Sequence, residues 1–426
     1  MIRVFKRVVF LFMSGSDKTI AKIVLTGGPC AGKSTALSRI EKEFSKQGWH
    51  CMFVPEQATE LMSTGIGPGT VSSPYLYQKI QLEGQLFREK LCEVAAKNSL
   101  SDKVLIVCDR GALDGKAYMS DKEFRQMASE FGTSEVALRD RYDAVFHLET
   151  TAKGALDAYT NANNSVRTET PEQAAALDDK VIAAWTGHPH LRIIQNTESG
   201  IDGKMSNLMR EIAASLGEPV PNEIERKFLI EKPDVDKLMR DFNCKPVEIR
   251  QFYLRAPEGE EHRIRQRGSD GTFVYTETVK SDVPGTNGEV RTEREQRLTE
   301  HDFIAKLVDM DPNKQPVQKT RYCLTDNGHY YELDMYPTWK DHAIMEIELS
   351  SPDEQFTIPK GINVIREVTN DRQFRNSSLA VNPIPAEVSD EVLGRGNLSK
   401  VQRRMPSGFE DYDDTGNDGE DASFGF

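Results

Sequence analysis

A glycine-rich segment near the start of the chain has the composition and spacing of a phosphate-binding loop. It reads Gly27-Gly28-Pro29-Cys30-Ala31-Gly32-Lys33-Ser34-Thr35 and matches the pattern G-x-x-x-x-G-K-S. Glycines let the backbone curl until its N–H groups and a helix N-terminus point at phosphate oxygens. Lys33 would then reach the β and γ phosphates, and the Ser34 hydroxyl would help to hold Mg²⁺. The segment predicts binding of a nucleoside triphosphate with Mg²⁺.

A second set of charged residues follows the apolar run Val104–Cys108. Chemistry at a metal-bound phosphate needs a carboxylate where a neighbouring parallel strand ends. Asp109 stands at that point, so it is our candidate metal ligand or catalytic base beside Lys33. Arg110 and Asp114 lie just beyond it and could face a substrate. The alternative is that Asp109 is simply an acidic residue that ends a strand.

A third candidate is Arg167, which precedes a helix start at Thr170-Pro171-Glu172-Gln173. That start has the spacing of a capping box and a proline at the first helical position. An arginine just before such a helix could close over the phosphates and stabilise charge during catalysis. A solvent-exposed arginine is the other interpretation, and the residues do not decide between them.

Charged residues alternate along several segments of the second half, as they do on one face of a β-strand. If these faces line a closed barrel, their cations could clamp a polyphosphate while their carboxylates hold a divalent metal. If they face outward, they are the solvated side of a sheet. The residues concerned are Glu223, Glu225, Lys227, Arg263, Arg265, Lys280, Arg321, Glu346 and Glu348.

The elements that must position these residues divide the chain. Short apolar strands alternate with helical stretches over residues 20–217, which predicts an α/β domain with a parallel sheet. Two prolines interrupt this pattern in a linker at 218–221. Residues 222–383 switch to period two, which predicts an all-β antiparallel barrel or tunnel. We expect an extension at 1–19 and an acidic, disordered tail at 384–426.

Composition narrows the class of protein. The net charge of −13 argues against nucleic acid as the main partner. No apolar run approaches the roughly 20 residues that span a bilayer, so we expect no transmembrane span. The six scattered cysteines are typical of reduced thiols. These features favour a cytoplasmic location. Residues 1–13 could be a weak organelle-targeting peptide, although translation could also start at Met13.

The first half resembles a known group of proteins through three features. These are the glycine-rich loop, the strand end Asp109-Arg110-Gly111, and the stretch from Arg167 to Pro189. Together they look like AAA-type P-loop ATPases related to nicotinamide-riboside and nucleoside kinases. The resemblance implies that Glu56, Gln78 and Asp109 face a small-molecule acceptor. Because this half contains no N-K-x-D sequence, the residues leave the choice between ATP and GTP open.

The second half resembles the CYTH, or triphosphate-tunnel, family over residues 222–383. The motifs E-x-E-x-K, R-x-R, a lysine strand, R-x-E-x-E and a late E-x-E come in that family's order. The resemblance implies a phosphate-rich ligand, with one set of residues on metal and another on phosphates. The metal set is Glu223, Glu225, Glu346 and Glu348, and the phosphate set is Lys227, Arg263, Arg265, Lys280 and Arg321.

The order of the two domains is similar to that of the TRPL-translocation-defect protein family. That resemblance implies a GTP- and phosphoinositide-binding regulator of membrane-protein trafficking, with peripheral membrane contact. An enzyme is the alternative, either a metal-dependent tunnel triphosphatase or a P-loop small-molecule kinase. Fold alone does not choose between these functions.

Overall fold

The structure is a computed structural model that describes residues 7–10, 18–155, 170–217, 224–282, 290–349, 354–385 and 388. For residues 7–10, 224, 282 and 290–294 only the backbone is described. By its internal contacts the chain separates into Met1–Pro385 and Ala386–Phe426. Everything below concerns the first of these units.

The first half contains a five-stranded parallel sheet in the order β3-β4-β2-β5-β6. Its strands are β2 (Thr19–Thr26), β3 (His50–Val54), β4 (Lys103–Asp109), β5 (Ala144–Leu148) and β6 (Leu191–Ile194). The central strands are apolar because both faces of a parallel sheet are covered by helices. The predicted α/β fold is confirmed, and β3 is a strand that the sequence did not reveal.

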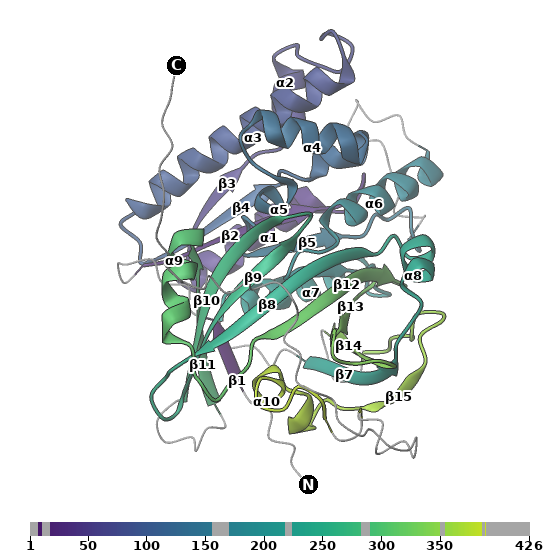
Figure 1. Ribbon diagram of the computed structural model, residues 1–426. Helices are drawn as coiled ribbons and strands as arrows, with labels where there is room; N and C mark the ends of the chain where they lie inside the picture. The colour runs from purple at the N-terminus through teal and green to yellow at the C-terminus, as the bar shows by residue number, and fades with distance from the viewer. Residues whose placement is uncertain are drawn as a thin grey trace, which may run out of the picture. The chain divides into compact units, whose positions relative to one another are not determined.

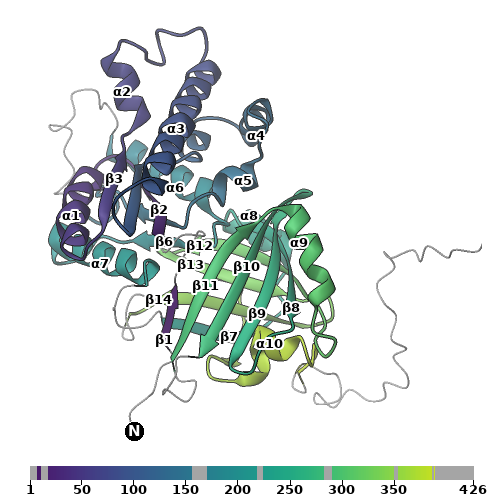
Figure 2. The same cartoon turned by 90° about the vertical axis from the view of Figure 1, so that its left-hand side faces the viewer.

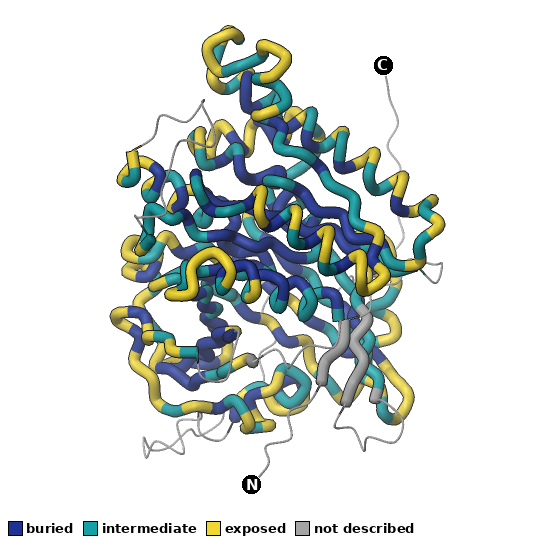
Figure 3. The backbone as a smooth tube through the Cα atoms, turned by 180° about the vertical axis from the view of Figure 1, so that it is seen from behind, coloured by how far each residue is buried: buried dark blue, intermediate teal, exposed yellow. Residues whose placement is uncertain are grey.

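Helices pack against both faces of this sheet (Figure 1). One face packs on α1 and α7, and the other on α3, α4 and α6. Figure 3 shows the strands between them as an almost continuously buried layer. The helices are α1 (Lys33–Lys46), α2 (Gln57–Ser63), α3 (Pro74–Lys97), η1 (Asp114–Tyr118), α4 (Asp121–Glu130), α5 (Glu135–Arg139), α6 (Pro171–Trp185) and α7 (Gly200–Ser215).

The second half contributes most of a ten-stranded sheet in the order β1-β11-β10-β9-β8-β12-β13-β14-β7-β15. All its pairings are antiparallel except that of β1 (Arg7–Phe10), which runs parallel to β11. Figure 2 shows β8 to β11 as long curved strands. The strands are β7 (Ile224–Glu231), β8 (Lys245–Leu254), β9 (Glu260–Ser269), β10 (Thr272–Asp282), β11 (Val290–Leu298), β12 (Val317–Asp326), β13 (His329–Met335), β14 (His342–Leu349) and β15 (Val364–Glu367).

The two faces of this sheet differ in chemistry, as the period of two predicts. One face is apolar and packs against its own helices, with Phe303 of α9 on Ile264 and Leu238 of α8 in a neighbouring cluster. Arg265 and Glu346 alternate with buried apolar neighbours and point to the other face. The helices are α8 (Val235–Asp241), α9 (Glu300–Lys306), η3 (Leu307–Asp309), η4 (Arg372–Phe374) and α10 (Asn376–Leu379). The predicted antiparallel tunnel-type fold is confirmed.

Several local predictions can be compared with the structure. Thr170 and Gln173 form the predicted capping box at the start of α6. The strand β8 was not predicted, because its charged residues obscure the apolar alternation, whereas the strand inferred around Arg321 from alternating charges is β12. The predicted linker at 218–221 lies outside the described residues. So does the predicted tail, apart from 384, 385 and 388.

Candidate functional site

The glycine-rich loop connects β2 to α1 in a conformation that requires glycine. Gly27 has φ 137° and Gly32 has φ 91°, both in the region that L side chains rarely adopt. A Cβ on Gly27 would lie 2.1 Å from the carbonyl oxygen of Leu148. The backbone therefore approaches β5 more closely than any other residue permits, and Cys30 has a positive φ of 58° as well.

Lys33 begins α1, and its side chain turns back into the loop. Its Nζ donates to the carbonyl oxygens of Gly27 at 3.1 Å and Gly28 at 3.2 Å. Burial, helped by the positive charge of Arg110, lowers the pKa of Lys33 to about 8. Ser34 and Thr35 lie exposed on the first turn of the helix. The loop thus holds one buried ammonium group behind an open helix N-terminus.

Asp109 ends β4, the strand next to the loop strand β2. Its Oδ1 is buried and has no hydrogen-bond partner among the described residues. Burial raises the pKa of this carboxyl, although the charge of Lys33 opposes the shift. A buried carboxylate oxygen without a hydrogen-bond partner is a suitable ligand for a hard divalent cation such as Mg²⁺. Asp109 and Ser34 are therefore the residues here that could hold the predicted metal.

Arg110 occupies the space beside the loop rather than pointing to solvent. Its Nε is 2.5 Å from Glu56, and its Nη1 is 3.1 Å from Asp114 and 3.3 Å from the carbonyl oxygen of Gly27. Burial opposes ionisation of Glu56, but Arg110 and Lys33 together lower its pKa to about 2. Arg110 thus binds the phosphate loop to Glu56, a residue predicted to face an acceptor.

Asp114 has a bracing role that the sequence did not reveal. It accepts hydrogen bonds from the Thr26 hydroxyl at 2.6 Å, the Gly111 N–H at 3.0 Å and the Trp185 indole N–H at 3.1 Å. Only 4% of its surface is exposed. Its contacts join β2 to the C-terminal end of α6, so Asp114 supports the site from behind.

Asp178 is a functional candidate that sequence reasoning missed. It lies buried on α6 and accepts a hydrogen bond from the loop N–H of Gly28 at 2.7 Å. Two nitrogen atoms flank its carboxylate, His147 Nε2 at 3.1 Å and Lys153 Nζ at 2.9 Å. Nothing in the helical pattern distinguished Asp178 from its exposed neighbour Asp179, because both read as ordinary helix acids. Tertiary packing alone brings one of them to the loop.

Two other predicted residues of this half have different outcomes. Gln78 is buried on α3 against η1, where a Cβ on Gly115 would lie 2.9 Å from its side-chain oxygen. Arg167 lies outside the described residues, although the helix α6 that follows it begins where predicted.

A cavity of about 830 Å³ is lined mainly by strands of the large sheet, together with first-half residues such as Asp140 and His190. All five predicted phosphate-binding cations line it, together with three of the four predicted metal-side carboxylates. These are Lys227, Arg263, Arg265, Lys280, Arg321, Glu225, Glu346 and Glu348. Glu223 lies outside the described residues. The charged faces therefore point inward, as the tunnel interpretation predicts and the wet-face interpretation does not.

Ion pairs cross one wall of this cavity. Lys227 Nζ lies 2.6 Å from Glu346 and 3.7 Å from Glu225. Arg321 lies 2.7 Å from Glu346 and also pairs with Asp334 at 2.6 Å. Burial opposes ionisation of Glu346, but Lys227 and Arg321 hold its pKa well below the usual range. Asp334 was not predicted, although the alternation Glu332, Asp334 on β13 carries the same period-two signal.

The opposite wall concentrates positive charge. Arg263 and Arg265 lie on the inner face of β9, and burial together with the charge of Arg263 lowers the pKa of Arg265 to about 10. Arginines crowded in this way are stabilised by a bound anion, which restores the charge balance. The wall is therefore suited to a polyanionic ligand.

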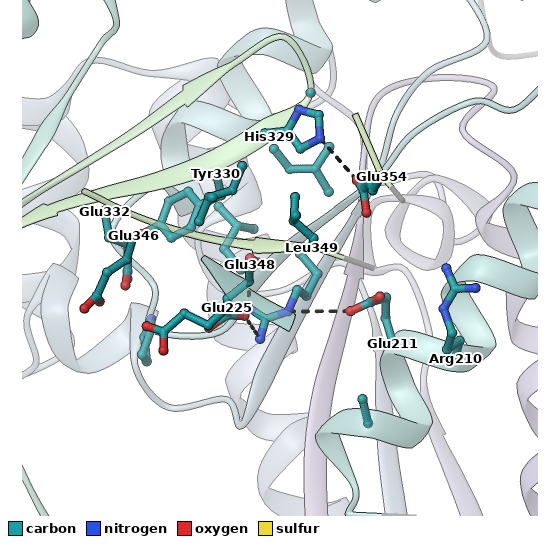
Figure 4. A pocket seen from close by; sticks show the side chains of 17 residues that line it. Arg210, Glu211, Glu225, His329, Tyr330, Glu332, Glu346, Glu348, Leu349 and Glu354 are labelled. Atoms are coloured by element: carbon teal, nitrogen blue, oxygen red, sulfur yellow. Dashed lines mark hydrogen bonds and ion pairs between the residues drawn. The ribbon is translucent and has the colours of Figure 1, made fainter. Parts of the chain in front are cut away.

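The metal-side carboxylates are partly engaged by protein cations. Within the described ranges, no three His, Cys, Asp or Glu side chains gather as a ready metal-ligand group. Glu348 pairs with Arg192, which also lies 3.6 Å from Glu211. Figure 4 shows Glu211, Glu225, Glu346 and Glu348 among the residues that line this pocket. The carboxylate oxygens of Glu225, Glu346 and Glu348 are of the type that Mg²⁺ and Mn²⁺ prefer as ligands.

No helix in the described part of the chain is both long and apolar enough to cross a membrane.

Comparisons with known proteins agree with the two halves. The AAA domain family matches residues 22–200. An inorganic triphosphatase of Acetivibrio thermocellus is 27% identical over 161 residues, which is 38% of this chain and 94% of that protein. The protein NE1496 is 30% identical in one crystal structure, with 38% of this chain and 98% of that chain covered and a TM-score of 0.28.

Two further structures complete the comparison. NE1496 is described as an inorganic triphosphatase in a second structure, with 29% identity, 38% and 96% coverage and a TM-score of 0.29. NadR in complex with NAD and AMP-PNP is 12% identical, with 47% of this chain and 51% of that chain covered and a TM-score of 0.33. The first half of the chain therefore contains an AAA-type P-loop domain, and the second half is a β domain similar to an inorganic triphosphatase.

Proposed function

We propose that this protein is a nucleotide-regulated binding protein. Its P-loop domain holds ATP or GTP with Mg²⁺, and its tunnel receives a phosphate-rich ligand, either a free polyphosphate or a phosphoinositide headgroup. The observation that carries the proposal is the single cavity lined by all five predicted phosphate-binding cations. The glycine-rich loop, with Lys33 and the unpartnered Asp109 oxygen, supports the nucleotide part.

The nucleotide part is tested by calorimetric titration with ATP and with GTP in the presence of Mg²⁺. Lys33→Ala removes the only ammonium group of the loop motif and should abolish binding. The exposed Lys46→Ala at the far end of α1 serves as the control and should bind like the wild type. Failure of both nucleotides to bind the wild type would refute this part and leave the tunnel proposal standing.

The tunnel part is tested with tripolyphosphate. Arg265→Gln should weaken binding by roughly tenfold to a hundredfold, since a hydrogen bond to a charged group contributes about 1.5–3 kcal/mol. Arg250→Gln on the neighbouring strand β8 is the control, because Arg250 is exposed. Equal affinities for the two variants would contradict the tunnel as the binding site.

The two sources of phosphate are separated by a sedimentation assay. Liposomes that contain a phosphoinositide are compared with liposomes of the same lipids without it, each with and without GTP. Binding that requires the phosphoinositide and is sensitive to GTP supports a trafficking regulator at a membrane surface. Binding of tripolyphosphate with indifference to liposomes supports a free polyphosphate ligand instead.

A tunnel triphosphatase is the second candidate, and the identity to an inorganic triphosphatase favours it. Phosphate release from tripolyphosphate with Mg²⁺ or Mn²⁺ tests it. Glu346→Gln should then abolish release while Lys33→Ala leaves it unchanged. The reverse pattern, with ATP and a nucleoside acceptor, would indicate a P-loop kinase. Absence of any product in both assays supports the binding protein.

A further inference from the structure

One ion pair of the cavity joins the two folds. Glu348 lies on β14 of the large sheet, whereas its partner Arg192 lies on β6 of the parallel sheet. The cations that engage the other described metal-side carboxylates, Lys227 and Arg321, belong to the large sheet itself. Arg192 is therefore a charge that the P-loop domain contributes to the tunnel's carboxylates.

Arg192 is held in this position from both sides. Its Nε is 3.6 Å from Glu211 on α7, and only 16% of the Arg192 side chain is exposed. A few residues along, Gln195 Nε2 donates to the carbonyl oxygen of Gly328 at 2.9 Å, in the turn between β12 and β13. A Cβ on Gly328 would lie 2.6 Å from the Gln195 side chain, so the two segments are in close contact. The approach of β6 to the tunnel is thus built into the fold.

The carboxylates near Arg192 would otherwise attract a cation. Glu225 and Glu346 both pair with Lys227, at 3.7 Å and 2.6 Å, and Glu225 lies opposite Glu348 in the pairing of β7 with β14. Figure 4 shows both side chains near Glu348. A divalent ion placed among these oxygens would meet the guanidinium of Arg192, and like charges at such distances repel. Arg192 and a metal therefore compete for Glu348.

We propose that Arg192 is a gate on the tunnel's metal site, which keeps Glu348 from binding a divalent cation until β6 moves or the ion pair opens. This proposal rests on the tunnel part of the proposed function and adds its regulation. Because β6 continues into the loop that precedes α7, and Ile201 of α7 packs near Gly32 of the phosphate loop, the gate lies on an element shared with the nucleotide site.

The test measures Mn²⁺ binding directly, by electron paramagnetic resonance of the free ion, with no phosphate present. Arg192→Ala should raise the affinity of one Mn²⁺ site by about tenfold. This is the size of effect expected when a partly exposed ion pair no longer competes with the ion. Arg210→Ala is the matched control, because Arg210 lines the same pocket as Arg192 and Glu348 but donates to Asn207 on its own helix. Its Mn²⁺ affinity should equal that of the wild type.

Two further variants decide between a gate and a general change of charge. In Arg192→Ala with Glu348→Gln the added affinity should disappear, and in Arg192→Lys the wild-type affinity should be kept. Arg192→Gln is measured alongside in case the alanine variant unfolds, with thermal unfolding as the check. Mn²⁺ affinities that are equal for the wild type, Arg192→Ala and Arg192→Gln overturn the proposal. Because these titrations contain no phosphate, they are independent of whether wild-type protein binds tripolyphosphate.

Discussion

At the scale of single residues, the nucleotide site is governed by one buried ammonium group. In the described part of the chain, Lys33 donates only to carbonyl oxygens of its own loop, and burial lowers its pKa. A bound triphosphate would place negative charge beside the Lys33 ammonium group and so favour its charged form. The chemistry of the site should therefore depend on the protonation state of Lys33.

We predict a falling nucleotide affinity at alkaline pH. Phosphates favour the charged lysine, so the pKa of Lys33 rises on binding, and affinity is constant below about pH 8 and decreases above it. Between pH 7 and pH 9.5 the dissociation constant should increase by roughly tenfold or more. Titration calorimetry at both pH values, in buffers of different ionisation enthalpy, measures the affinity and the proton uptake. Lys46→Arg should show the same pH dependence, and a flat wild-type profile would contradict this role of Lys33.

At the scale of elements, α6 supports the phosphate loop through Asp178. This carboxylate joins the helix to the Gly28 N–H and to His147 and Lys153 on other segments, and none of its surface is exposed. Burial opposes its ionisation, but His147 and Lys153 hold its pKa well below the usual range. The helix and the loop are thus coupled by a charge that the fold can retain only while its partners are in place.

We predict that Asp178→Ala lowers the free energy of unfolding by about 2 kcal/mol, since it leaves the buried Gly28 N–H and the buried His147 ring without their acceptor. Asp179→Ala, next to it and 70% exposed at the side chain, should change it by less than about 0.5 kcal/mol. Because the folded pKa of Asp178 is depressed, its stabilisation is present above about pH 4 and is lost as the pH falls towards the folded value. Urea unfolding at pH 7 and pH 3 measures both effects, and equal losses for the two variants would argue against the special role of Asp178.

At the scale of the whole molecule, the large sheet shares buried polar contacts with the ends of α5 and α6 within the Met1–Pro385 unit. Arg267 of β9 lies 2.7 Å from Asp140 and donates to the carbonyl oxygen of Gly187 at 2.7 Å. Arg139 holds the same carboxylate at 2.6 Å, and all three charged side chains are buried. Removing one charge from such a cluster leaves the others uncompensated.

We predict that Arg267→Ala lowers the free energy of unfolding by about 3 kcal/mol. Combined with Asp140→Ala in a double-mutant cycle, it should show a coupling energy of about 1–3 kcal/mol, because the two groups are in contact. Chemical unfolding followed by fluorescence and circular dichroism measures both quantities. Arg250→Ala, on the exposed side of β8, is the control with little expected effect. A coupling energy near zero would mean that the contact contributes nothing to the fold.

Much of the site was open to prediction because local pattern determines it. The spacing of Gly27, Gly32 and Lys33 predicts a phosphate loop, since only glycine fits those backbone angles. The period of two predicted which charges of β7, β9 and β14 share a face, and the order of the motifs predicted a tunnel. These inferences need only neighbours along the chain.

What the tertiary structure decided concerns partners far apart in sequence. Sequence alone could not distinguish Asp178 from Asp179, or show that Arg110 contacts Glu56 and that Asp114 contacts Trp185, because these partners lie on other elements. Nor could it place Arg192 beside Glu348, because the two residues lie on different sheets and far apart in the sequence. The packing of whole elements determines which residues form ion pairs. The residue pattern along one strand does not predict which element packs against it.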